Sequence, residues 1–216
     1  MHSVPARLAY AVTQDVTVFL DIDNDRYFRL PAGLEPAFRA ALSGSTRGGD
    51  GLERLIQLGV LEPTPVVDRP ERRAAVPVAE SVVDMDAGRA RAGVTTALAA
   101  ASSLVRARAL LRRGFAKALT VLTHRSGRRG ASREIEAVRS ASLAFLAARR
   151  IVPIQPVCLL DSVALLDFLS RRGLDADLVF GVIARPFSAH CWLQVGDLAL
   201  NDEFDNLTGR APILVV

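Results

Sequence analysis

The chain has 216 residues, half of them hydrophobic, which is enough for one large domain or two small ones with a buried core. Almost all of its basic residues are arginines, since Lys117 is the only lysine, and the formal net charge is +4. Arginine and alanine richness together indicate a base-composition bias, so this charge does not predict nucleic-acid binding. Two cysteines exclude a disulfide framework, and no apolar run is long enough for a membrane span. We therefore expect a cytoplasmic protein.

The N-terminal part of the sequence predicts a small unit of three strands followed by two helices. Alternating apolar residues predict strands over Arg7–Thr13, Val16–Ile22 and Arg26–Leu30. Helical periodicity follows over 31–42 and again over 52–58, and Gly59 ends the second helix. This order of elements predicts a winged-helix-like module over 1–65.

The middle of the chain combines a linker with basic helices. Prolines and scattered charges indicate a linker at 66–89. The helical pattern over 94–122 breaks near Gly114, and Ser132 is a suitable N-cap for a further helix. Residues 101–150 hold 12 basic side chains against two acidic ones. This excess indicates a solvated helix face, or a surface that steers an acidic peptide or partner protein.

The residues that predict chemistry begin at Cys158. Pro153 and Pro156 keep the preceding chain extended, because the residue before a proline is disfavoured in the helical region. The apolar pattern then predicts a helix over Cys158–Arg172, ended by Gly173. A thiol at a helix N-terminus feels the positive end of the helix dipole, which lowers its pKa and favours the thiolate. Cys158 is therefore our candidate nucleophile.

A histidine and an acid follow on predicted strands. Ser188–Val195 predicts a strand whose alternation puts His190 on one face and Cys191 on the other. The chain turns at 196–197 and returns toward Asp202. A cysteine nucleophile, a histidine that transfers its proton and an aspartate that fixes the imidazole tautomer together make a Cys/His/Asp site. The order of residues predicts such a site.

The register of the last two strands decides whether the acid can reach the histidine. A two-residue loop at 196–197 pairs His190 with Glu203 and leaves Asp202 on the opposite face. His190 and Asp202 share a face only if the loop has three residues or one strand carries a bulge. With a plain two-residue turn, we expect Glu203 to replace Asp202.

The sequence around these residues resembles the lasso-peptide leader peptidases, the B proteins of lasso-peptide and microcin-type biosynthesis. The resemblance rests on CLLDSVALL from Cys158, LVFGV from Leu178, PFSAHCWLQVGD from Pro186 and LND at 200–202. It implies a transglutaminase-like fold, with Cys158, His190 and Asp202 as the catalytic residues. Cys191 departs from the family, which usually has a small residue such as alanine there. Because strand alternation turns Cys191 away from His190, we expect it to serve in packing.

The stretch FLDIDNDRYFRLP from Phe19 resembles the leader-recognition domain of peptide-modifying systems, a winged-helix-like module related to the pyrroloquinoline quinone chaperone. In that family the leader adds as an extra strand to the third strand and lies against the last helix. Strand addition requires an exposed sheet edge. The resemblance implies leader contacts from Arg26, Tyr27, Phe28, Leu30, Leu52, Leu55 and Ile56.

We therefore expect an α+β protein with the winged-helix-like leader-recognition module at 1–65 and a papain/transglutaminase-like cysteine peptidase domain at 90–216. The resemblance implies that Cys158 cleaves the leader from a ribosomal precursor peptide before an asparagine-synthetase-like lasso cyclase closes the macrolactam ring. It implies no metal or organic cofactor for this chemistry. Two alternatives stay open at this point: an acyltransferase that uses the same three residues, and a leader-binding protein without catalysis.

Overall fold

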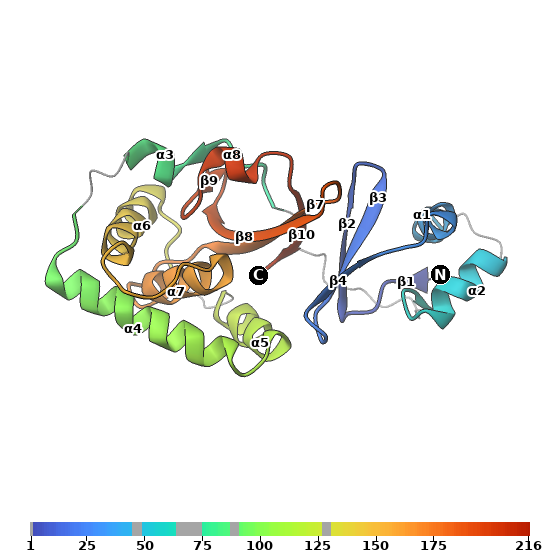
Figure 1. Ribbon diagram of the computed structural model, residues 1–216, viewed down its shortest axis with the longest axis horizontal. Coiled ribbons are helices and arrows are strands. Elements are labelled where there is room, and N and C mark those ends of the chain that lie inside the picture. Colours follow the sequence, from blue (N-terminus) through green and yellow to red (C-terminus); the bar gives the residue numbers. More distant parts are fainter. Residues whose placement is uncertain (1, 45–48, 64–74, 87–90, 127–130) are drawn as a thin grey trace.

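The structure, a computed structural model, describes residues 2–44, 49–63, 75–86, 91–126 and 131–216. The loop at 127–130 and much of the expected linker at 66–89 lie outside these ranges. The described residues form a mixed α and β protein, as predicted. A three-stranded sheet from the N-terminal part lies beside a five-stranded sheet from the C-terminal part (Figure 1).

The N-terminal unit contains the three predicted strands in the predicted order. They are β2 (Leu8–Thr13), β3 (Val16–Asp21) and β4 (Arg26–Arg29), paired antiparallel in the order β2-β3-β4. A 3-10 turn, η1 (Ala32–Leu34), leads to α1 (Glu35–Leu42) and α2 (Asp50–Gln57), and β1 (His2–Ser3) pairs with β5 (Glu62–Pro63). Gly59 follows α2 with a φ of 66°, as expected of a glycine that ends a helix. Whether this unit is a winged-helix-like leader-recognition module stays a prediction.

Both faces of the N-terminal sheet are covered. On one face Phe19 stacks on Phe28, with ring centroids 5.0 Å apart, and meets Phe38 of α1 edge-on at 5.2 Å. On the other face Val18 and Leu20 are fully buried in the core of the C-terminal unit. The N-terminal sheet therefore shares a hydrophobic core with the rest of the chain.

The C-terminal unit is a five-stranded sheet with helices packed on it (Figure 1). Its strands run in the order β10 (Ala211–Val215), β7 (Asp177–Ile183), β8 (Ser188–Val195), β9 (Leu198–Ala199) and β6 (Glu80–Ser81). The helices are α3 (Val82–Asp86), α4 (Val94–Leu111), α5 (Phe115–Ser126), α6 (Ile135–Arg149), α7 (Cys158–Ser170) and α8 (Phe204–Leu207). The helix α7 lies against β7 and β8, with α4 and α6 packed on it from outside. This central position makes α7 buried along most of its length.

Part of the expected linker belongs to this unit. Residues Glu80 and Ser81 form β6, which pairs in parallel with β9. Val82 then begins α3 and is fully buried in the core. The described part of 66–89 is thus folded onto the sheet, and the domain boundaries at 65 and 90 stay predictions.

The helix limits differ from the expected ones at one end. Gly114, with a φ of 100°, separates α4 from α5 as the sequence predicts. Ser132 does not cap α6, however. The Glu134 carboxylate accepts hydrogen bonds from the backbone N–H groups of Glu136 and Ala137, so Glu134 is the N-cap. Ser132 instead forms a bridge to Leu174, which ties the start of α6 to the chain before β7.

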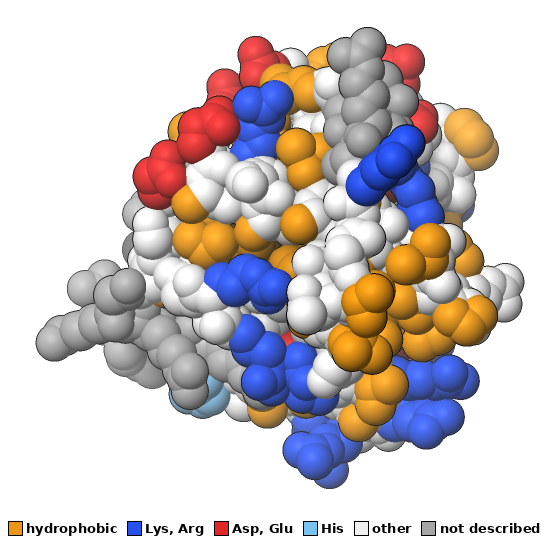
Figure 2. All heavy atoms as spheres, turned by 90° about the vertical axis from the view of Figure 1, so that its left-hand side faces the viewer, with side chains coloured by type: hydrophobic (Ala, Val, Ile, Leu, Met, Phe, Trp, Pro, Cys, Tyr) orange, Lys and Arg blue, Asp and Glu red, His pale blue; other side chains and the backbone are white. Residues whose placement is uncertain are grey.

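Some arginines of 101–150 form ion pairs within the fold. The sequence had indicated only a solvated helix face or a surface that steers an acidic partner. Arg106 of α4 pairs with the buried Asp167 of α7 at 2.6 Å, and Arg149 pairs with Asp161 at 2.7 Å. Arg133 donates to Asp177 at the start of β7. These ion pairs join helices to one another and to the sheet, so several basic side chains serve the fold. Other basic side chains gather among apolar ones at the lower part of the face in Figure 2.

The helix α4 is long and apolar enough to cross a membrane, with a mean hydropathy of 1.2. In the structure it packs as part of the fold, because Ala100, Leu104 and Ala107 lie in the main core. Its length and composition are therefore weak evidence for a span. The cytoplasmic location stays a prediction.

Candidate active site

Cys158 is the first residue of α7, as predicted. The residue before it, Val157, is extended and offers no side-chain cap to the helix. The Arg149 guanidinium donates to the carbonyl groups of Val152 and Ile154, at 3.2 and 2.7 Å, and also binds Asp161 in the first turn of α7. Arg149 therefore fixes the segment that leads into Cys158. Sequence reasoning missed this contact, because in a basic stretch an arginine that binds backbone carbonyls looks the same as a solvated one.

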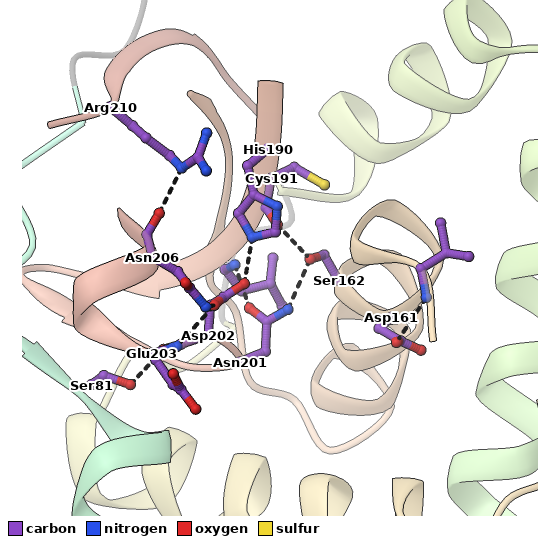
Figure 3. A network of polar contacts seen from close by, with 12 residues as sticks. Ser81, Asp161, Ser162, His190, Cys191, Asn201, Asp202, Glu203, Asn206 and Arg210 are labelled. Carbon is purple, nitrogen blue, oxygen red and sulfur yellow. Dashed lines mark hydrogen bonds and ion pairs between the residues drawn. The ribbon is translucent and has the colours of Figure 1, made fainter. Parts of the chain in front are cut away.

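The candidate base, His190, lies on β8. One edge of β8 at this point pairs with no other strand of the described residues. Along one edge β8 pairs with β7 from Ser188 to Gln194, with Gly181 opposite His190. Along the other edge β9 pairs only with Gln194 and Val195. The start of α7 approaches β8 beyond this short ladder, and the Ser162 hydroxyl donates to the Cys191 carbonyl at 3.3 Å (Figure 3). His190 and Cys158 thus come from different elements that meet at an open strand edge.

Asp202 contacts His190 although the turn before it has two residues. The register pairs Val195 with Leu198, which is the arrangement that was expected to exclude Asp202. That expectation is wrong, because the strand ends after Ala199. The side chain of Asn201 accepts the Leu193 N–H at 2.8 Å, so the chain leaves the ladder there and no longer alternates. The carboxylate of Asp202 then binds His190 Nε2 (Figure 3).

Several polar groups fix Asp202 in this position. Its Oδ1 accepts from the Glu203 N–H at 2.9 Å and from the Asn206 amide at 2.8 Å. Its backbone carbonyl accepts from the Ser81 hydroxyl of β6 at 2.5 Å. The Glu203 side chain is exposed. Only the backbone N–H of Glu203 belongs to this network. Sequence reasoning missed Ser81, because it lies 121 positions away from Asp202 in a segment that resembles a linker.

The electrostatics favour a charged cysteine and histidine pair. Hydrogen bonds from the Cys191 and His190 side chains lower the pKa of the Cys158 thiol to about 4, against the opposing effect of burial. Hydrogen bonds to Asp202 and to Cys158 raise the pKa of His190 to about 9. Burial alone raises the pKa of Asp202, but hydrogen bonds from His190 and Asn206 outweigh it and hold this pKa below its ordinary value. At neutral pH the site therefore holds a thiolate, an imidazolium and a carboxylate.

This charge state predicts that the rate of a reaction at Cys158 that uses His190 as the acid has a broad, bell-shaped dependence on pH. Below about 4 the Cys158 thiolate gains a proton, and above about 9 His190 loses the proton that it must give to a leaving group. Alkylation of Cys158 by iodoacetamide should therefore stay fast from about pH 5 to pH 8. Rates that rise only near the ordinary pKa of a free thiol would contradict the ion pair.

The role expected for Cys191 is incomplete. The residue is buried, 2% exposed, and packs in the main core, as the prediction requires. Its thiol nevertheless interacts with the Cys158 side chain, which raises the pKa of Cys191, although alternation was expected to turn it away from the site. The packing of α7 explains the difference, because Cys191 and the buried side chains of α7 share one core, so α7 covers the face of β8 that carries Cys191.

The N-terminal sheet also reaches this site. Tyr27 of β4 packs beside Phe187, which lies in the turn between β7 and β8, with ring centroids 5.7 Å apart. Burial and the nearby Cys191, Asp25 and Cys158 raise the pKa of Tyr27. Phe187 is half exposed, so the two rings form an aromatic wall close to the nucleophile.

The other predicted leader-binding residues divide into two groups. The side chains of Leu30, Leu52 and Leu55 are buried in the core of the N-terminal unit. The expectation that these three contact a leader is not supported by their burial. Accessible side chains remain at Arg26, Phe28 and Ile56, in addition to Tyr27.

Comparison with known proteins agrees with this geometry. A model of the transglutaminase-like superfamily matches residues 100–215, more than half of the chain. A stretch of 45 residues is 47% identical to the Microcin J25-processing protein McjB of Escherichia coli; it covers 21% of this chain and 22% of that protein. No solved structure matches the chain. Since the matched region contains Cys158, His190 and Asp202, this chain belongs to the transglutaminase-like superfamily.

Proposed function

We propose that this protein is a cysteine peptidase that removes the leader from a ribosomally made lasso-peptide precursor. The observation that carries the proposal is the meeting of Cys158, His190 and Asp202 at the open edge of β8. The partial likeness to a microcin-processing protein supports the class of substrate. The superfamily match supports the thiol-based chemistry.

The proposed reaction begins with the Cys158 thiolate, which attacks the carbonyl carbon of the bond between leader and core. His190 holds its Nε2–H toward Asp202, so its Nδ1–H is the proton that passes to the leaving amine of the core. Val157 provides no side-chain cap to α7, and we infer that N–H groups in the first turn of this helix stabilise the oxyanion. Water, activated by His190, then hydrolyses the thioester and releases the leader.

The leader reaches this site along β4. This strand forms one edge of the three-stranded sheet, and its outer edge is unpaired among the described strands. An extended leader that adds to this edge gains main-chain hydrogen bonds, while alternate side chains give selectivity. Tyr27 lies on β4 and packs beside Phe187, and the charge of Cys158 is near enough to raise the pKa of Tyr27, so a chain bound along β4 is led toward Cys158. We infer that the aromatic wall of Tyr27 and Phe187 packs on the residues next to the cleaved bond.

Replacement of Tyr27 tests whether the aromatic wall binds the substrate without affecting the reactivity of Cys158. We expect Tyr27→Ala to lower kcat/KM for the precursor by about tenfold, mostly through KM, because it removes apolar contact with the substrate. Tyr27→Phe keeps the ring and should retain nearly full activity. The rate of Cys158 alkylation should not change in either variant. An unchanged kcat/KM in Tyr27→Ala would mean that the aromatic wall does not contact the substrate.

The proposed partners follow from the same reaction. The released core carries a new amino terminus, which is the group that an asparagine-synthetase-like lasso cyclase joins to an acidic side chain in the macrolactam ring. The peptidase itself needs no ATP for hydrolysis, so any ATP requirement belongs to the cyclase.

Mass spectrometry of a precursor peptide encoded beside this protein tests the proposed function. We expect cleavage at one leader–core bond, with the mass of water added across the two products. An acyltransferase would instead add the mass of an amine to the leader, and hydroxylamine or a primary amine in the buffer would increase that product. A peptide that binds but is never cut, with and without the cyclase, would leave a leader-binding protein.

A further inference from the structure

The two cysteines of the chain lie together in the candidate site but differ in every property that governs oxidation. Cys158 is exposed, whereas Cys191 is only 2% exposed and packs in the main core. Cys158 is held as a thiolate by its neighbours, and Cys191 is held as a thiol. A thiolate that solvent can reach, next to a second protected thiol, is the arrangement of a redox-sensitive pair.

Independent contacts place Cys191 against the start of α7. Ser162 lies one turn along α7 from Cys158, on the same side of the helix. Its hydroxyl donates to the Cys191 carbonyl at 3.3 Å and accepts from the Asn201 amide at 2.9 Å. Figure 3 shows these contacts and the sulfur of Cys191 on the side of β8 that faces α7. The packing of α7 on β8 therefore holds the backbone of Cys191 within one helical turn of Cys158, and the two thiols shift each other's pKa.

We propose that Cys191 is a resolving cysteine, which forms a reversible disulfide with Cys158 when a peroxide oxidises the nucleophile. In the first step the Cys158 thiolate attacks one oxygen of hydrogen peroxide, and a sulfenic acid and hydroxide form. In the second step the Cys191 sulfur attacks the Cys158 sulfur; the S–S bond forms, the S–O bond breaks, and the hydroxyl leaves as water. Overall, two thiols and one peroxide give one disulfide and two waters.

The chemistry of the site favours this order of events. As long as Cys158 is a thiolate, its charge and hydrogen bond raise the pKa of Cys191 and keep that thiol unreactive. Sulfenic acid formation removes the negative charge, so the Cys191 thiol can lose its proton more easily. The hydroxide released in the first step takes a proton from the His190 imidazolium, and the neutral imidazole next to Cys158 can then accept the Cys191 proton. The disulfide protects Cys158 from irreversible oxidation to sulfinic and sulfonic acids.

This inference rests on the proposed function in one respect: the activity that the disulfide would abolish is the proposed peptidase activity. Its test uses the intact mass of the full chain after treatment with hydrogen peroxide, which needs no peptidase activity. We expect the wild type to lose two hydrogen atoms and to give a peptide pair linked through Cys158 and Cys191 in a non-reducing digest. Dithiothreitol should reverse the mass change and should restore any cleavage of the precursor that the peroxide abolished.

Two variants make the test specific. In Cys191→Ala, the same peroxide dose should add two or three oxygen atoms at Cys158, and dithiothreitol should restore neither mass nor activity. In Cys158→Ala, Cys191 should stay unmodified because it is buried. Cys191→Ser, which is closer in size, replaces the alanine variant if that one does not fold. If the wild type gains oxygen atoms at Cys158 and forms no linked peptides, Cys191 is not a resolving cysteine.

Discussion

Cys158→Ala should lower cleavage of the precursor by at least about 10⁴-fold, because the second cysteine, Cys191, is buried and its raised pKa keeps it a thiol that does not attack the substrate. The residue lies at the surface of α7, so its replacement removes little buried area and the fold should persist. We expect the variant still to bind the precursor, since β4 and the aromatic wall are unchanged. Cleavage is measured by mass spectrometry, and binding by fluorescence polarisation of a labelled leader.

A matched control lies at the other end of the same helix. Ser170 is the last residue of α7, is exposed, and contributes no side-chain contact to the site. Ser170→Ala should therefore cleave at the wild-type rate. Cleavage by Cys158→Ala at a rate near that of the wild type would assign the reaction to other residues and end the proposal of a cysteine peptidase.

Asp202→Asn should lower kcat by roughly 10²–10⁴-fold with a smaller effect on KM. The amide can no longer hold the charged imidazole, so His190 loses both its orientation and much of the stabilisation of its proton. Because the pKa of His190 is raised chiefly by Asp202, the alkaline limb of the pH profile should also move to lower pH. This shift distinguishes a positioning carboxylate from one that serves only the fold.

Glu203→Gln is the control for this variant. Glu203 is the neighbouring acid, and a β9 strand continued beyond Ala199 in the same register would have placed it opposite His190. In the structure its side chain is exposed, and only its backbone N–H reaches Asp202. We expect wild-type kcat and an unchanged pH profile. A loss in Glu203→Gln that equals the loss in Asp202→Asn would mean that the register of the sheet differs from the one described.

The sequence alone was sufficient for features that depend on neighbours along the chain. The alternation of Ser188–Val195 and the apolar pattern from Cys158 to the helix end before Gly173 define β8 and α7 almost to the residue. Gly114 and Gly173 mark helix ends, since both adopt a positive φ that other residues avoid. The candidate triad was identified by its order and by the segments that surround it.

The tertiary structure alone decided which distant groups meet. Asp202 reaches His190 because the Asn201 side chain replaces a strand carbonyl, and no alternation rule includes that exchange. Ser81 fixes Asp202 from a segment that composition assigns to a linker, and Tyr27 reaches the site from another unit. Cys191 meets Cys158 because α7 packs on the face of β8 that carries Cys191. Local patterns determine secondary structure, whereas the site depends on contacts between elements that are remote in sequence.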